Sequence, residues 1–319
     1  MGEFSNQGDK RRDDAARAAW LYFINGRTQD EIARQLDLSR QAVQRLVSFA
    51  VNEKLIKFRM DHPIASCMSL AQEIAERHQL EFCDVVPTDR AEPESIGGVS
   101  LATALRMNRL LSAKAPTVLA VGTGRTLRAA VDELDAIDRP QHKIVSLVGN
   151  MAADGHASPY EVAMRLADKI GAQRFPMPAP VVTETAEERE ALQSQRSFAI
   201  LHELRAQARA SFVGIGELSW QSPLHQDGFV SDAEIAELIE AGAVGEITGW
   251  PFDIDGRRVD TSIYDRVASL NLETPPKRLT VVVGCGPQKV SPIKAALTGQ
   301  LLSALVTDEA TAMKILEDQ

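Results

Sequence analysis

The stretch "VLAVGTGRTLRAAVDEL", residues 118–134, decides the fold. Four apolar residues, a turn with two glycines and an amphipathic segment follow one another, which predicts a buried strand, a tight turn and a helix. Gly122 and Gly124 leave the backbone open, and the helix that follows directs its unpaired amides at the same point. Thr123 and Thr126 add hydroxyl groups, and Arg125 adds a positive charge. This pattern is typical of a phosphate-binding turn, although the same residues also suit a plain tight turn.

Short apolar segments alternate with helical stretches on both sides of this unit. The segments are FCDVV (82–86), TVLAV (117–121), KIVSLV (143–148), SFVGIG (211–216), LTVVVG (279–284) and LLSALVTD (301–308). Such alternation predicts a mainly parallel sheet with helices on both faces. We therefore expect an α/β protein with a doubly wound, mainly parallel, Rossmann-like domain over residues 81–319. Two irregular insertions, residues 175–190 and 242–256, are candidate walls of a ligand site.

The first 60 residues have a different pattern, which predicts three short helices in one compact domain. An amphipathic segment runs from Asp13 to Asn25, and Thr28 and Glu31 have the spacing of a capping box for a second helix. Ser39 is well placed as the N-cap of a third. A linker helix over residues 61–80 then connects this domain, residues 1–60, to the α/β domain.

The second and third helices have the spacing of a helix-turn-helix, with Ala33 at the contact, Leu38 in the turn and Val43 in the core. In such a unit the N-terminal polar residues of the second helix enter the major groove of DNA. The residues at these positions are Arg40, Gln41, Gln44 and Arg45, with Thr28, Gln29 and Ser39 where phosphates are gripped. The alternative is a three-helix dimerisation or packing module with a solvated polar face.

Charge is distributed unevenly between the two regions. The chain has a net charge of -9, yet residues 1–60 carry eleven Lys and Arg against eight Asp and Glu. A mildly basic module joined to an acidic one suits a nucleic-acid contact at one end only. Cys67, Cys83 and Cys285 lie far apart, so we expect neither disulfides nor a metal site. No apolar run approaches the roughly 20 residues of a membrane span, and we expect a cytoplasmic protein.

The order of these parts resembles the SorC family of bacterial sugar-responsive transcriptional regulators. Residues 28–56 resemble that family's N-terminal helix-turn-helix domain, and AVGTGRTL (120–127), VGIGEL (213–218), GAVGEITGWPFDIDG (242–256) and the segment 281–312 resemble its later landmarks. The resemblance implies an effector pocket lined by Gly122, Thr123, Gly124, Arg125, Thr126, Glu217 and Lys289. It also implies a homotetramer that binds palindromic, double-stranded operator DNA. The family often has a glycine in the turn and basic residues late in the recognition helix; this chain has Asp37 and VSFAVNE.

The segment GWPFDIDG, residues 249–256, leaves two interpretations open. Trp250 and Phe252 could stack on a sugar while Asp253 or Asp255 binds its hydroxyls. A hairpin tip with a buried aromatic side chain is equally consistent with the sequence.

The α/β domain of this family also resembles sugar-phosphate isomerases and deaminases, so an enzyme is the competing interpretation. The segment ADGHASPYE contains Asp154, His156 and Glu161, which resemble the deaminases' proton-transfer groups. Those enzymes, however, carry the triplet in the later half of the domain, whereas here it lies in the first half. We expect no catalytic residue and no cofactor. The sequence thus predicts a DNA-binding regulator of carbohydrate or polyol catabolism, controlled by a small sugar, a polyol or its phosphate.

Overall fold

The computed structural model describes residues 3–53, 55–56, 63–89, 91–149, 151 and 161–317. The chain separates into two compact units, Met1–Asp61 and His62–Gln319. Lys57 and Arg59, which the sequence places in a short extended segment after the third helix, lie outside the described residues.

The smaller unit consists of three helices, α1 (Glu3–Phe23), α2 (Gln29–Leu36) and α3 (Arg40–Asn52). Its core is small: Leu21 of α1 packs with Ile32 of α2 and with Val43 and Val47 of α3. A second cluster brings α1 and α3 close together through alanine side chains, Ala15 and Ala19 against Ala50. Helix α1 starts at Glu3, ten residues before the start that its apolar spacing predicts.

The caps that the sequence predicts are present at both later helices. The Thr28 hydroxyl accepts the Glu31 amide while the Glu31 carboxylate accepts the Thr28 amide, and the Ser39 hydroxyl accepts the Ala42 amide. Between the helices, Asp37 adopts the left-handed conformation with a φ of 55°, which Asp tolerates better than most residues. The chain therefore turns sharply between α2 and α3 without a glycine.

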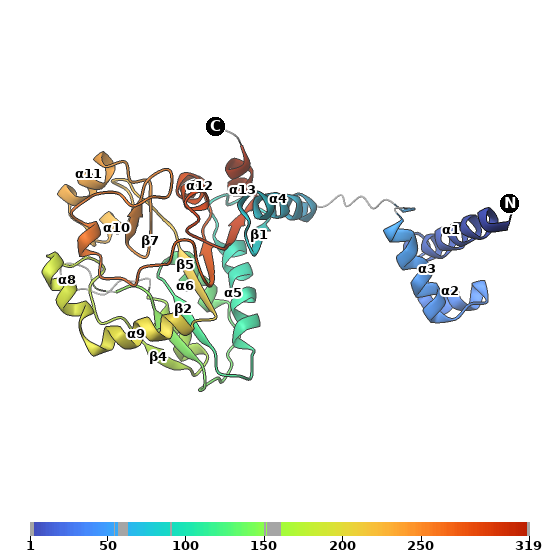
Figure 1. Cartoon of the computed structure of the whole chain (residues 1–319), viewed down its shortest axis with the longest axis horizontal. Coiled ribbons are helices and arrows are strands. Elements are labelled where there is room, and N and C mark those ends of the chain that lie inside the picture. Colours follow the sequence, from blue (N-terminus) through green and yellow to red (C-terminus); the bar gives the residue numbers. More distant parts are fainter. Residues whose placement is uncertain are drawn as a thin grey trace. The chain divides into compact units, whose positions relative to one another are not determined.

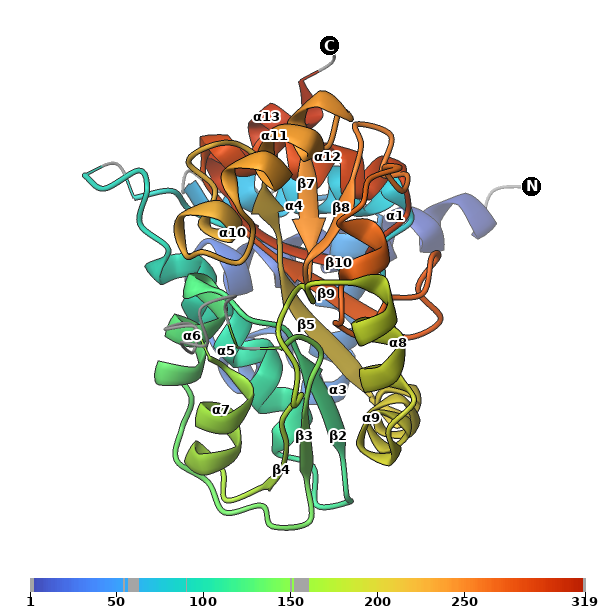
Figure 2. The same ribbon diagram turned by 90° about the vertical axis from the view of Figure 1, so that its left-hand side faces the viewer.

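The larger unit is built on a seven-stranded sheet in which every strand pair is parallel, with the order β1-β10-β9-β5-β2-β3-β4 (Figure 2). The strands are β1 (Phe82–Val86), β2 (Val118–Val121), β3 (Lys143–Ser146), β4 (Gln173–Phe175), β5 (Ala210–Gly214), β9 (Leu279–Val283) and β10 (Ala304–Asp308). The predicted parallel α/β class is confirmed. From β2 the chain continues to β3 and β4 at one edge, and from β5 it continues through β9 to β10 in the other direction. The strand order therefore reverses between β2 and β5, and such reversal points are where open α/β sheets bind ligands.

Helices cover both faces of this sheet (Figures 1 and 2). One face packs against α5 (Gly97–Leu111), α6 (Arg125–Asp132) and α7 (Ala163–Lys169), and the other against α4 (Pro63–His78), α9 (Arg196–Gln207), α12 (Val290–Thr298) and α13 (Glu309–Leu316). Helix α4, in the segment that the sequence assigns to a linker, contacts β1 and α13 of this larger unit.

Beside the main sheet lies a three-stranded antiparallel sheet of β6 (Gly216–Glu217), β7 (Gly245–Ile247) and β8 (Trp250–Phe252). The remaining elements are α8 (Ala186–Gln193), α10 (Pro223–Gln226), α11 (Asp232–Glu240) and the short 3-10 helices η1 (Tyr264–Arg266) and η2 (Pro287–Lys289). Part of the segment 242–256, expected to be irregular, is thus a hairpin.

The hairpin is attached to α12 by an unusually close backbone contact. A Cβ on Gly299, just after α12, would lie 2.7 Å from the Gly256 Cα atom. A Cβ on Gly256 would lie 2.4 Å from the carbonyl oxygen of Ala295. Both positions therefore need glycine for the chain segments to approach this closely.

Candidate functional site

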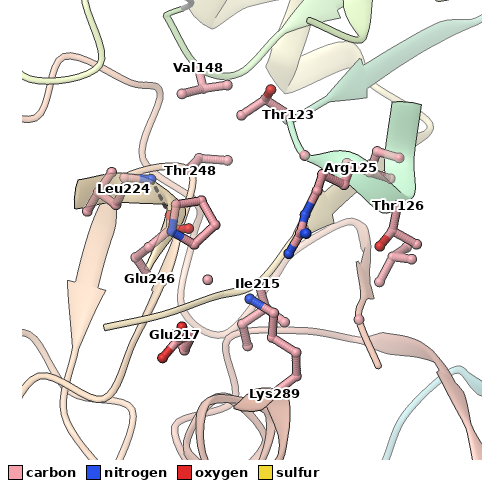
Figure 3. A pocket seen from close by; sticks show the side chains of 18 of the residues that line it. Thr123, Arg125, Thr126, Val148, Ile215, Glu217, Leu224, Glu246, Thr248 and Lys289 are labelled. Carbon is pink, nitrogen blue, oxygen red and sulfur yellow. Dashed lines mark hydrogen bonds between the residues drawn. The ribbon is translucent and has the colours of Figure 1, made fainter. Parts of the chain in front are cut away.

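A cavity opens at the carboxyl ends of β2, β5 and β9, at the point where the strand order reverses (Figure 3). The loop after β2 contributes Thr123 to Thr126, the loop after β5 contributes Glu217, and the loop after β9 contributes Lys289. Three segments that are distant in the sequence therefore meet here, as the sequence predicts for these residues. The hairpin β7–β8 adds a further wall with Glu246, Thr248 and Gly249.

The loop after β2 presents the N-terminus of α6 to this cavity. Gly124 is its N-cap, with a φ of 131° that side chains of L residues rarely adopt. Arg128 donates to the Gly124 carbonyl, so the amides of residues 125–127 precede the first bond of the helix. Those amides and the Arg125 side chain form one positive end of the site.

Gly122 has a different position from its neighbours. Its amide donates to the Phe212 carbonyl at 2.8 Å and is therefore engaged in the sheet. Gly122 lines a small adjoining cavity with Ser146, and a Cβ there would touch the Thr248 methyl group at 3.4 Å. It makes room for the hairpin and does not line the main cavity.

Lys289 is half-buried at the end of η2, where α12 begins. Burial lowers the pKa of its ammonium group, an effect that the carboxylates of Glu246 and Glu217 oppose and that Arg125 reinforces. Among the described residues, Lys289 has no ion-pair partner within 4.0 Å. Its side chain and that of Arg125 point into the same part of the cavity in Figure 3.

Glu246 is a site residue that the sequence did not reveal. Burial raises the pKa of its carboxyl group, although an amide bond from Gly249 and the Lys289 charge act in the opposite direction. The Gly249 amide donates to Glu246 Oε2 at 2.7 Å. Because Gly216 pairs with Glu246 and Glu217 with Gly245, two neighbouring strands bring both carboxylates to one wall. Figure 3 shows Glu217 and Glu246 facing the cavity across from Arg125.

Thr248 occupies a strained position on the same wall. It and Gly249 form the two-residue turn of the hairpin with φ angles of 54° and 87°, as in a type I′ turn. Glycine and asparagine favour this conformation, whereas a β-branched residue is a genuine outlier there. Its buried hydroxyl has no hydrogen-bond partner among the described residues. Thr248 thus brings backbone strain and an unsatisfied hydroxyl group to the cavity wall.

The segment that follows β6 covers one side of the cavity. Leu224 and Phe229 add apolar surface, and Asp227 adds a third carboxylate to the lining. His225 does not line the cavity; its ring bonds the Asp232 carboxylate at 2.8 Å and the Trp220 carbonyl at 3.0 Å. The hydrogen bond to Asp232 raises the pKa of His225.

Asp253 is not among the residues that line the cavity. Its carboxylate accepts the amides of Asp255 at 2.9 Å and Arg257 at 2.8 Å, which closes the turn after β8. Trp250 and Phe252 are buried in apolar clusters. The interpretation of this stretch as a hairpin with buried aromatic side chains agrees with the structure.

The residues proposed for proton transfer have no described cluster. Asp154 and His156 lie outside the described residues, and Glu161 accepts the amides of Met164 and Arg165 at the start of α7. Within the described part of the chain, no group of three His, Cys, Asp or Glu residues could hold a metal ion. No helix in that part is long and apolar enough to cross a membrane.

In the smaller unit, the residues predicted to contact DNA lie on α3 and at the two helix caps. Gln29 is half-buried, and the others are exposed: Thr28, Ser39, Arg40, Gln41, Gln44 and Arg45. The Arg40 guanidinium lies 3.6 Å from the Asp30 carboxylate, and Arg45 Nε donates to the Gln41 carbonyl at 3.3 Å. An exposed pair of this kind is worth little, so Arg40 can leave Asp30 at small cost.

Together, the fold and the cavity define a class: a ligand-binding α/β domain with its site at the switch point, preceded by a three-helix unit with an exposed polar helix face. Residues 62–317 match the family model described as "Putative sugar-binding domain". The chain belongs to this family, the sugar-binding domains of SorC-type regulators.

Comparisons with individual proteins agree. The chain is 32% identical to the erythritol catabolism regulatory protein EryD of Brucella abortus over 302 residues, which span 95% of this chain and 96% of that one. It is 29% identical to the transcriptional regulator LsrR of an Enterobacter species over 94% of this chain and 92% of the relative. Among solved structures, the full-length sorbitol operon regulator SorC of Klebsiella pneumoniae shares the fold, with a TM-score of 0.71, 22% identity and coverage of 95% and 98%.

Proposed function

We propose that the chain is a DNA-binding transcriptional regulator of carbohydrate or polyol catabolism, controlled by a small ligand in the cavity at the ends of β2, β5 and β9. The observation that carries this proposal is a cavity with cations on one side and carboxylates on the other, on the same chain as a three-helix unit. The relatives named as regulators over nearly their full length support it.

The ligand is a short sugar or polyol that carries one phosphate group. Arg125, Lys289 and the free amides of α6 suit a phosphate, because charged donors and a helix N-terminus both favour an anion. Glu217 and Glu246 suit hydroxyl groups, since ionised carboxylates only accept hydrogen bonds. A free polyol uses the second set alone and leaves two cations without a counter-charge.

The smaller unit is a helix-turn-helix domain that reads DNA. Arg40, Gln41, Gln44 and Arg45 on α3 contact base edges in the major groove, and Thr28, Gln29 and Ser39 contact phosphates. The exposed positions of these side chains on and before one helix support this assignment, with Gln29 half-buried. Asp37 provides the sharp turn that the arrangement needs.

The ligand acts on DNA binding through the assembly of the chain. A homotetramer with paired helix-turn-helix domains would match an operator with two-fold symmetry. The ligand shifts the equilibrium only if it binds one arrangement of the domains more tightly than another. It must therefore change the affinity for the operator, and the operator must change the affinity for the ligand by the same factor.

A thermal-shift screen of sugars, polyols and their phosphates tests the proposal. Erythritol and erythritol phosphate form the first pair, because the relative from Brucella abortus is named for erythritol catabolism. A phosphate ester that raises the melting temperature and changes affinity for DNA upstream of the protein's own gene supports the proposal. A response to the free polyol alone would contradict the assignment of a phosphate. Turnover of a pentose or hexose phosphate would instead establish the isomerase or deaminase-like alternative.

A further inference from the structure

The cations of α3 are confined to its first half. Arg40 and Arg45 lie in the first two turns, and no lysine or arginine follows between Leu46 and Asn52. A helix that lies in the major groove passes a phosphate backbone beyond its base-reading residues, and DNA affinity depends largely on the phosphates that cations neutralise. The later half of α3 supplies no such cation itself.

Helix α1 places an arginine at that end of α3. The Arg11 guanidinium carbon lies 4.6 Å from the centre of the Phe49 ring. Phe49 follows Arg45 by four residues, one turn further along the same side of α3. The close approach of the two helices, with Ala15 and Ala19 of α1 against Ala50, allows Arg11 to reach the ring.

Arg11 shares a shallow groove with the predicted DNA-reading side chains. The groove is lined by Arg11, Gln41, Gln44, Arg45, Ser48, Phe49 and Asn52. Among the described residues, Arg11 has no ion-pair partner within 4.0 Å. Its neighbour Arg12 differs, because it approaches the Glu53 carboxylate to 3.9 Å. Arg11 is therefore the α1 cation that faces the same surface as Gln44 and Arg45.

We propose that Arg11 binds a DNA phosphate beyond the base-reading residues and replaces the cation that α3 lacks. This inference rests on the proposed function. The Phe49 ring holds the planar guanidinium by a cation–π interaction, so its N–H groups are oriented before DNA arrives. A planar donor group of this kind binds phosphate with two parallel hydrogen bonds.

A purely structural role for Arg11 makes different predictions, because its stem can cover Phe49 without touching DNA. Arg11→Met keeps an unbranched cover of the ring and removes the charge, whereas Arg11→Lys keeps the charge. Arg17→Met is the matched control, since Arg17 is exposed on the same helix and does not line the groove.

The experiment measures binding of the full-length protein to two labelled duplexes of equal length, by fluorescence anisotropy between 50 and 200 mM salt. One duplex is the DNA upstream of the protein's own gene and the other has random sequence. For Arg11→Met we expect weaker binding to both duplexes in the same ratio, and a salt slope less steep by about 0.9 for each phosphate that is no longer neutralised. Over this salt range, each such phosphate makes the fall in affinity about threefold to fourfold smaller. Arg11→Lys restores most of the affinity, and Arg17→Met changes neither quantity.

Other outcomes overturn the inference. An unchanged salt slope in Arg11→Met, with a native melting temperature, means that Arg11 touches no phosphate. A weaker affinity for the upstream duplex alone means that Arg11 reads bases instead. Equal effects of Arg11→Met and Arg17→Met mean that net charge, and not position, matters. If the unmodified protein binds neither duplex at 50 mM salt, the proposed function itself fails, which none of the variant results would imply.

Discussion

The two units of this chain present their polar side chains in opposite ways. On α3 the proposed DNA-reading side chains are exposed, and the apolar residues beneath them, such as Val43 and Val47, hold the helix without their help. In the α/β unit, the charged groups are enclosed by protein, and burial shifts the pKa values of Glu246 and Lys289 in opposite directions. Substitutions on α3 should therefore change binding without changing stability, whereas substitutions in the cavity should change both.

The largest expected effect is that of Arg40→Ala on DNA binding. Loss of a bidentate base contact costs about 1–3 kcal/mol at each half-site, so two half-sites give a loss on the order of a hundredfold. The Arg40–Asp30 pair is exposed and 3.6 Å apart, so the fold should not weaken measurably. Operator titration together with thermal melting checks both statements. Arg34→Ala, exposed on α2, is the control, and a melting temperature lowered by Arg40→Ala would break the contrast between the units.

The second effect is that of Lys289→Met on the response to ligand. Because the ammonium group is proposed to bind the phosphate, the variant should lose the ligand-induced rise in melting temperature. At a ligand concentration a hundred times the dissociation constant, that rise reflects about 2.7 kcal/mol. Lys314→Met, exposed on α13, should keep the full rise. A full shift in Lys289→Met would place the ligand elsewhere.

The third effect concerns pH and the buried carboxyl of Glu246. Its pKa is raised in the folded chain, so the folded chain holds more protons than the unfolded chain between the two pKa values. Stability from this group is therefore complete below the unfolded pKa and is lost as the pH rises through the folded pKa. Glu246→Gln lacks this loss, and its melting temperature relative to the unmodified protein should increase with pH in the absence of ligand.

Denaturation scans from pH 4 to pH 9 measure that difference. Glu240→Gln, an exposed residue of α11, is the matched control and should run parallel to the unmodified protein. The same Glu246→Gln variant should bind the ligand more weakly, because an amide replaces a pair of strong acceptors. A flat difference across this pH range would mean that Glu246 is as well solvated as an exposed residue.

The smallest effect is that of Thr248→Gly. Glycine removes the strain of the left-handed backbone and the unpaired hydroxyl, but it also removes the packing of the buried methyl group and adds entropy to the unfolded chain. The expected net change is a melting temperature higher by about 1–3 °C without ligand. Calorimetry with and without ligand provides the measurement. If ligand affinity stays the same in this variant, the Thr248 hydroxyl makes no contact with the ligand.

Much of the fold follows from the sequence because its strands are buried and apolar. Six of the seven strands of the main sheet lie at the predicted segments. The seventh, β4, was missed because Gln173, Arg174 and Phe175 form a short edge strand with mostly exposed side chains, which gives no apolar run. Similarly, the start of α1 could not be predicted, because the residues between Glu3 and Asp13 are polar and show no apolar periodicity.

The cavity could be predicted only in part. Thr123 to Thr126, Glu217 and Lys289 follow strand ends, and parallel strands bring such residues to one edge. Glu246 gives no comparable signal, since it reaches the cavity through a hairpin that packs beside the main sheet. A two-residue turn at Thr248 and Gly249 was the available clue. With that turn, Trp250 to Phe252 become the returning strand and Asp253 falls beyond it, in the next turn.

The contact between Gly256 and Gly299 has an evolutionary consequence. It joins the hairpin that carries Glu246 and Thr248 to the helix that begins beside Lys289, with no room for a side chain between the two backbones. Relatives that diverge toward new ligands can exchange side chains at positions 246, 248 and 289 while this wall of the cavity keeps its position. The same two glycines prevent divergence by displacement of the wall, so ligand preference in this lineage should change by substitution and seldom by insertion.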